Sequence, residues 1–182
     1  MALDLNTAIR KRRMYREFED RPVSREDAAA LVWAAGRAQQ ARPGTRHLIV
    51  VDDPGLMKTA RTVLAGLTRM KVPMMLVLCS DISNPSVDCA AGRDRSTWMD
   101  AGAACAHIAL AAQDLGLGVC TIAGWTQSAV RALFEIPDHL RPDVTVVVGY
   151  PLTTQNMRPV SGAKYRPAVH YNEFGIPFEQ EA

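Results

Sequence analysis

The order of hydrophobic and polar residues along the first part of the chain predicts two helices and a loop. An apolar stripe over residues 3–9 has helical spacing and leads into a basic cluster. Residues 24–27, Ser-Arg-Glu-Asp, have the pattern of a capping box, and the apolar face that follows predicts a second helix ending near Gly36. Residues 39–46 show no periodicity and contain Pro and Gly, so we expect a loop there.

The middle of the chain predicts two strands separated by a helix. Residues 47–51 are short and rich in β-branched residues, and residues 73–79 are continuously apolar, as in a strand covered on both faces. Between them we expect a helix that begins at Pro54 and runs to Leu67. The Pro-, Asn- and Ser-containing residues 80–92 predict a loop.

The longest helical pattern starts at residue 94 or 95 and ends at Leu115. Its apolar residues occupy nearly the whole circumference, which is typical of a helix buried nearly all round. A chain of 182 residues cannot easily cover such a helix by itself. We therefore expect it to be completed by a second subunit in an obligate dimer.

The last third of the chain predicts two more strands, at residues 119–123 and 144–148, with a helix after Thr126 between them. Residues 151–182 contain several prolines and little periodicity, so we expect an extended tail that lies on its own domain or across a dimer. Helices and strands alternate irregularly, which favours an α+β fold, a sheet sandwiched by helices, over a parallel α/β fold. The length predicts a single domain over residues 1–182.

Composition changes this picture in one respect, the placement of charge. Apolar residues make up 48% and charged residues 22%, as in ordinary globular proteins, and the formal net charge is +2. Five cations lie between Arg10 and Arg16, so the rest of the chain is net negative. This argues against a general nucleic-acid binder. The arginines suit bidentate binding of phosphate or carboxylate, although a solvated basic helix end explains the composition equally well.

The cysteines and the hydropathy indicate a compartment. Four cysteines, at positions 79, 89, 105 and 120, form no Cys-x-x-Cys pair, so we expect small buried thiols in a reducing environment. The N-terminus is too polar for a secretory signal, and no apolar run is long enough to span a membrane. These features predict a cytoplasmic protein with neither a membrane nor a nucleic-acid partner.

The local sequence motifs indicate no catalytic residue. Residues 116–121, Gly-Leu-Gly-Val-Cys-Thr, lack the third glycine of a dinucleotide fingerprint and follow a helix where the fingerprint follows a strand. There is no P-loop and no Gly-x-Ser-x-Gly elbow, and the four histidines are too scattered to bind a metal ion together. Asp100, on the long helix, is either a polar partner in a cavity or a local capping residue.

Several segments, in order along nearly the whole chain, carry a family resemblance. They are residues 8–18 (Ala-Ile-Arg-Lys-Arg-Arg-Met-Tyr-Arg-Glu-Phe), 100–104, 111–120, 129–133, 136–137, 147–151, 164–167 (Lys-Tyr-Arg-Pro) and 169–171. Together they resemble the FMN-dependent nitroreductase family. The resemblance implies a central, mostly antiparallel sheet sandwiched by helices, with the long buried helix at the dimer interface.

The resemblance also implies cofactor-binding residues. The FMN phosphate would be held by Arg12, Arg13 and Arg16 near one end of the chain and by Lys164 and Arg166 near the other. The flavin ring would be approached by Thr121, Ile122, Ala123 and Gly124, whose small side chains let backbone N–H groups come close.

Two departures from the family pattern affect this site. Met14 occupies a position where the family often has serine. A hydroxyl contact to the cofactor is therefore missing, and the backbone of Met14 would make the contact instead. Residues 38–45 keep nothing of the family's Pro-Ser-x-x-Asn-x-Gln-Pro pattern, so Gln39, Gln40 and Arg42 would supply substitute hydrogen bonds. The long insertion that covers the flavin in larger members is absent here, which leaves residues 80–92 as the available lid.

The implied function is a homodimeric FMN-dependent NAD(P)H oxidoreductase with two flavins at the subunit interface. In a ping-pong mechanism NAD(P)H would reduce the flavin and leave, and a nitroaromatic, quinone or related small organic acceptor would take its place. Hydride chemistry resides in the cofactor, so no catalytic acid, base or metal ligand is named. The alternatives are a non-catalytic protein that binds flavin or a phosphorylated ligand on the same fold, and a basic-patch nucleic-acid binder.

Overall fold

The computed structural model describes residues 4–68, 70–83, 90–152 and 168–176. Its elements, in chain order, are α1 (Leu5–Lys11), α2 (Arg25–Arg37), β1 (Arg46–Val51), α3 (Pro54–Val63), the 3-10 helix η1 (Ala65–Leu67), β2 (Met74–Asp81), α4 (Ala90–Asp114), β3 (Gly118–Ile122), α5 (Gln127–Leu133) and β4 (Leu140–Gly149). The strands form one antiparallel sheet in the order β1-β2-β4-β3. The predicted α+β fold is thereby confirmed.

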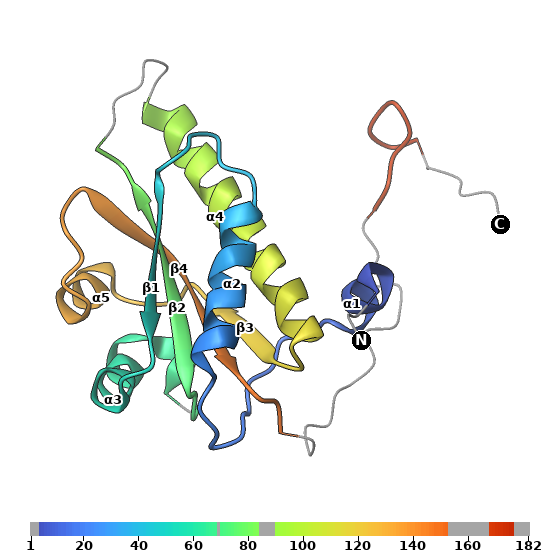
Figure 1. Cartoon of the computed structure of the whole chain (residues 1–182). Coiled ribbons are helices and arrows are strands. Elements are labelled where there is room, and N and C mark those ends of the chain that lie inside the picture. Colours follow the sequence, from blue (N-terminus) through green and yellow to red (C-terminus); the bar gives the residue numbers. More distant parts are fainter. Residues whose placement is uncertain (1–3, 69, 84–89, 153–167, 177–182) are drawn as a thin grey trace.

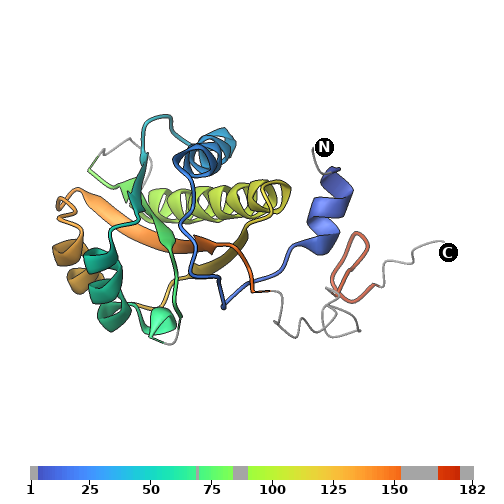
Figure 2. The same cartoon turned by 60° about the horizontal axis from the view of Figure 1, so that its bottom comes forward.

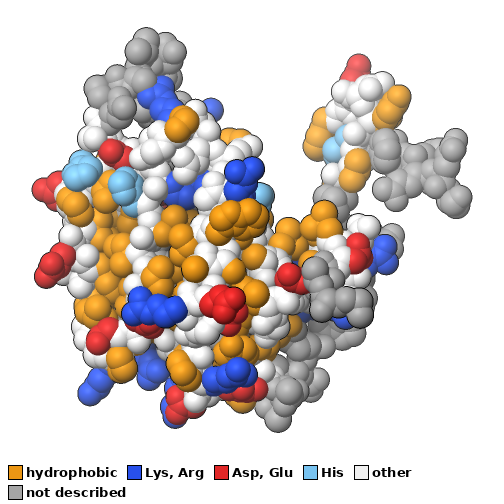
Figure 3. All heavy atoms as spheres, in the orientation of Figure 1, with side chains coloured by type: hydrophobic (Ala, Val, Ile, Leu, Met, Phe, Trp, Pro, Cys, Tyr) orange, Lys and Arg blue, Asp and Glu red, His pale blue; other side chains and the backbone are white. Residues whose placement is uncertain are grey.

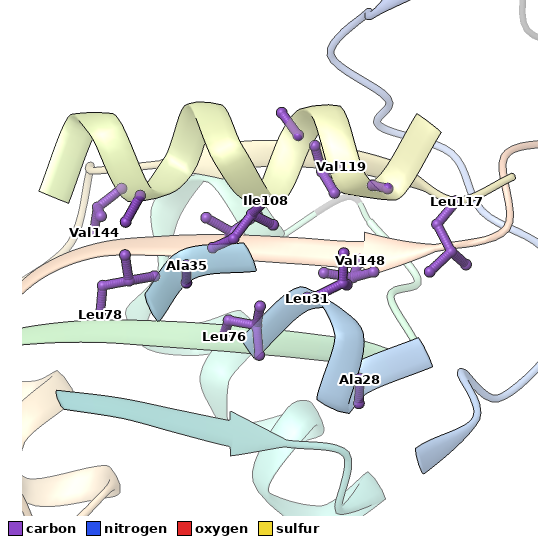
Figure 4. Packing of buried hydrophobic residues seen from close by; sticks show 14 of the residues in the cluster. Ala28, Leu31, Ala35, Leu76, Leu78, Ile108, Leu117, Val119, Val144 and Val148 are labelled. Atoms are coloured by element: carbon purple, nitrogen blue, oxygen red, sulfur yellow. The ribbon is translucent and has the colours of Figure 1, made fainter. Parts of the chain in front are cut away.

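Helices cover both faces of this sheet, with α2 and α4 on one side and α3 and α5 on the other (Figures 1 and 2). The central strand β2 is buried from Met74 to Ser80, as its continuous apolar run predicts. Figure 4 shows Leu31 of α2 and Ile108 of α4 packed onto Leu76 and Val148 of the sheet. Burial of alternate strand residues under two helix layers therefore forms the core.

The boundaries of three elements differ from the sequence prediction. The helix after Pro54 ends at Val63, because Leu64 is extended and pairs with Trp125 before η1 begins. Helix α4 starts at Ala90, so the expected loop over residues 80–92 is shorter, and residues 84–89 of it lie outside the described part. β4 starts at Leu140, four residues early, because its first part pairs with the end of β2.

The segment that follows α1 crosses the sheet at the outer side of β3. Met14 forms a parallel bridge with Val119, and the Tyr15 N–H donates to the Val119 carbonyl at 2.9 Å. A Cβ atom at Gly118 would lie 2.6 Å from Cγ of Tyr15, closer than van der Waals contact allows. The absence of a side chain at Gly118 therefore lets the N-terminal segment lie directly against the sheet.

Helix α1 lies at the margin of the body, beside α4, and residues 168–176 project away from the body (Figures 1 and 2). Both carry exposed apolar side chains, with Leu5 63% and Phe174 92% exposed. In the single chain α4 is also apolar at its surface, where Met99 is 65% exposed. Burial of α4 all round, as its pattern predicts, is thus not achieved within one chain.

The described helices include none that is both long and apolar enough to cross a membrane.

Candidate functional site

The N-terminal basic segment and β3 form one wall of a hollow of about 520 Å³. Arg16 lines it beside Thr121 and Ile122, which bond to β4 within the sheet. Two sets of residues that the sequence analysis assigns to the cofactor, more than a hundred positions apart, therefore meet at one place. The volume is in the range of small-molecule sites.

The other residues of the basic cluster have different surroundings. Nη1 of Arg13 donates to the backbone carbonyls of Arg10 and Arg12, both at 2.8 Å, so this guanidinium neutralises the C-terminal end of α1. Arg12 is the half-buried C-cap residue of α1. Met14 is 41% exposed and contributes its backbone to the bridge with β3. Within the described residues, Arg16 is the one cation that lines the hollow.

The opposite wall of the hollow comes from η1 and the residues after it. Ala65, Gly66 and Thr68 line it together with Met70. The Ala65 N–H donates to the carbonyl of Gly124 at 3.1 Å, which ties η1 to the exposed Ala123 and Gly124 after β3. Sequence reasoning missed this wall because small side chains within a helical pattern carry no chemical signal.

Gln39 and Gln40 line a different, smaller hollow of about 210 Å³, together with Ala41, Ser96, Met99 and Asp100. Arg42 is half-buried, and its carbonyl accepts a hydrogen bond from Oγ1 of Thr45 at 2.9 Å. Sequence reasoning also missed Arg46, whose guanidinium lies behind this loop.

The two hollows have no lining residue in common. Asp100, near the middle of α4, lines the smaller one, whereas Arg16, η1 and β3 line the larger one. Within one chain, residues 39–41 and Arg16 therefore line separate hollows. Lys164 and Arg166 lie outside the described residues.

The larger hollow has one feature that a flavin phosphate ester requires, a cation at its wall. Arg16 supplies this positive charge, the acidic Glu17 lines the hollow next to it, and the other lining residues are small or apolar. Burial raises the pKa of the Cys120 thiol beneath it, and Arg16 partly opposes that shift. No group of His, Cys, Asp and Glu in the described part of the chain could hold a metal ion. The residues present thus fit FMN.

Comparisons with known proteins identify relatives of this chain. The model of the nitroreductase family matches residues 69–150, which include β2, α4, β3, α5 and β4. A protein of the archaeon Methanothermobacter thermautotrophicus, named as a candidate NADH dehydrogenase/NAD(P)H nitroreductase, is 30% identical over 169 residues. That alignment covers 86% of this chain and 82% of the relative.

Solved structures share the fold. A candidate NADH dehydrogenase/NAD(P)H nitroreductase from Parabacteroides distasonis superposes with a TM-score of 0.76 at 24% identity, covering 93% of this chain and 98% of the other. An FMN-dependent nitroreductase from Clostridium difficile gives a TM-score of 0.73 at 23% identity, covering 92% and 98%. At these identities the structural likeness shows the fold alone.

Proposed function

This chain belongs to the nitroreductase family, and from that premise we propose that it is an FMN-dependent NAD(P)H oxidoreductase that reduces nitroaromatic, quinone or related small organic acceptors. The observation that carries the proposal is the hollow where Arg16 of the N-terminal segment meets Thr121 and Ile122 of β3. A phosphate-binding cation there lies next to a wall of small residues, as a flavin mononucleotide needs.

In this proposal the chain's own residues bind and orient the cofactor. Arg16 holds the phosphate together with Arg12 and with Lys164 and Arg166, which lie outside the described residues, and the backbone of the exposed Ala123 and Gly124 faces the ring edge. When bound, FMN would supply the chemistry that takes electrons from NAD(P)H and gives them to the acceptor. We expect ping-pong kinetics, because donor and acceptor would use one position in turn.

The proposal includes a homodimer. Residues 39–41 and Arg16 line separate hollows within one chain, so in this proposal a second chain supplies one of the two sets to each cofactor. The exposed apolar side chains of α1, α4 and residues 168–176 supply surface for such an interface.

The proposal is tested on the purified full-length protein. We expect a flavin absorption spectrum, release of FMN identified by its mass, and NAD(P)H oxidation that depends on an added nitroaromatic or quinone. Initial rates over both substrates should give the parallel double-reciprocal lines of a ping-pong mechanism. A colourless protein that cannot be reconstituted with FMN would contradict the proposal.

A protein that binds FMN but does not oxidise NAD(P)H with any of the acceptors would instead support the non-catalytic flavin-binding alternative. The feature that favours this alternative is the departure of residues 38–45 from the family pattern. The two outcomes differ only in turnover, so the same preparation distinguishes them.

A further inference from the structure

Arg46, the first residue of β1, holds together three parts of the chain. Its Nη1 donates to the carbonyl of Ala35 in the last turn of α2 at 2.6 Å. Its Nη2 donates to the carbonyl of Gln39 in the loop at 2.6 Å and to that of Asp100 in α4 at 2.9 Å. One planar guanidinium thus joins a helix end, the loop and the long helix, which only an arginine fork can do.

Asp100 holds the same loop from the other side. Its side chain is buried, and Oδ2 accepts a hydrogen bond from the Ala41 N–H at 2.7 Å. Burial lowers the pKa of Arg46, and the nearby Asp100 carboxylate opposes that shift, so the two charges stabilise each other. The loop is therefore held by backbone contacts on both sides, at Gln39 and at Ala41.

These contacts do not use the side chains of the loop. Arg46 and Asp100 bond to backbone groups of the loop, while the side chains of Gln39 and Gln40 line the hollow beside Asp100. Residues 38–45 contain a single proline and a glycine, Gly44, at φ +82°, so the loop has little stiffness of its own. Its conformation depends on what holds it from behind.

We propose that Arg46 and Asp100, here called the loop anchor, are positioning residues that fix residues 39–42 in the conformation that contacts FMN. The inference rests on the proposed function, since it assigns this loop to the cofactor. Arg46 lines neither of the two hollows and acts through the backbone of the loop, and Asp100, which lines the smaller hollow, holds the loop through its bond to the Ala41 N–H.

The test uses two pairs of variants in the full-length protein. Asp100→Ala removes the acceptor for the Ala41 N–H, whereas Asp100→Asn keeps a carbonyl oxygen in its place. Arg46→Met removes all the donors, whereas Arg46→Lys keeps the charge but cannot reproduce the fork. Arg37→Met, at an exposed arginine of the same helix end, is the matched control.

Three quantities are measured: the FMN dissociation constant by flavin fluorescence, hydrogen–deuterium exchange of residues 39–42, and the thermal unfolding midpoint. We expect Asp100→Ala to weaken FMN binding about tenfold, the loss of one buried hydrogen bond to a charged group. In the FMN-free form of the same variant, the rate of hydrogen–deuterium exchange at residues 39–42 should rise. Asp100→Asn should restore both.

Each other outcome overturns the inference. If Asp100→Ala and Arg46→Lys bind FMN as tightly as the unmodified protein, or if Asp100→Asn loosens it as much as Asp100→Ala, the anchor does not position the loop. If Arg46→Met does not fold, the Asp100 pair decides by itself. Failure of the unmodified protein to bind FMN refutes the proposed function, and this inference falls with it, so the two failures are distinguishable.

Discussion

Arginines of one short segment have different surroundings, and this determines what each can do. Arg13 donates to the backbone carbonyls at the end of its own helix, while Arg16 lies in the hollow beside Thr121. A guanidinium that already satisfies carbonyl groups has fewer donors left for a phosphate. Charge counting along the sequence treats these residues as equivalent, but the structure does not.

Replacing Arg16 should therefore affect the cofactor more than the fold. We expect Arg16→Ala to weaken FMN binding by roughly tenfold or more, because a charge-assisted hydrogen bond to phosphate is lost. Arg10→Ala, which removes an exposed cation of the same cluster, is the control and should bind FMN nearly as before. Fluorescence titration measures both, and equal affinities would contradict the assigned role of Arg16.

Two thiols, of the buried Cys79 and the half-buried Cys105, give a second prediction at the residue scale. Burial raises the pKa of Cys79 to about 12 and that of Cys105 to about 11. At pH 8 their thiolate fractions are then about one in ten thousand and one in a thousand. We expect neither to be alkylated in the native protein, and both to react after unfolding. Peptide mass spectrometry after a timed iodoacetamide reaction checks this, and rapid native labelling of either would contradict the assigned burial.

At the scale of elements, the crossing of the N-terminal segment over β3 positions Arg16. It depends on the close approach of Tyr15 to the backbone of Gly118. The adjacent hydrogen bond from Tyr15 to Val119 sets where the following residues, including Arg16, meet the strand. The placement of the cation is thus a property of the packing between two elements.

A methyl group at Gly118 should disturb this crossing. We expect Gly118→Ala to lower the free energy of unfolding by about 1–3 kcal/mol through overpacking, and to weaken FMN binding as well. Gly36→Ala is the matched control, since a Cβ atom there meets nothing within 4 Å and α2 should gain slightly in stability. Denaturant unfolding and FMN titration measure the two effects. Unchanged FMN affinity in Gly118→Ala would show that the crossing does not position Arg16.

The elements also show what the sequence could predict. Periodicity predicted α2 and the buried strand β2, because their burial follows from local spacing of apolar residues. It missed the end of α3, because the pairing of Leu64 with Trp125 is a contact between distant segments. It also missed the start of α4 at Ala90. A tertiary contact decides the boundary of α3.

The candidate site divides in the same way. A family resemblance was enough to associate Arg16 with Thr121, and the structure places both in one hollow. Neither Ala65 nor Thr68 has a side chain that would mark it as a site residue. Arg46 acts through backbone carbonyls, which no pattern of side chains reveals.

At the scale of the whole molecule, a cofactor site divided between two chains has a testable consequence. We expect a homodimer by sedimentation, and we expect complementation between two inactive variants. In a mixed dimer of Arg16→Ala and Arg46→Met chains, one of the two sites has both of its contributions unmodified. FMN binding should therefore return at about half the sites of the mixed dimer.

The mixed dimer is formed by co-expression with two different affinity tags, and the separate homodimers are the controls. If each site lay within one chain, every site in the mixed dimer would carry one defect and no binding would return. That result, or a monomer in sedimentation, would contradict the shared site.

The bridge between Met14 and Val119 has one more consequence, for how the protein avoids self-association. The outer side of β3 would otherwise present free N–H and carbonyl groups, and the segment after α1 covers it at Val119. An uncovered strand edge recruits other strands and starts aggregation. The residues that bring the cations to the site thus also protect the sheet margin, so shortening the chain past Tyr15 would cost solubility as well as cofactor.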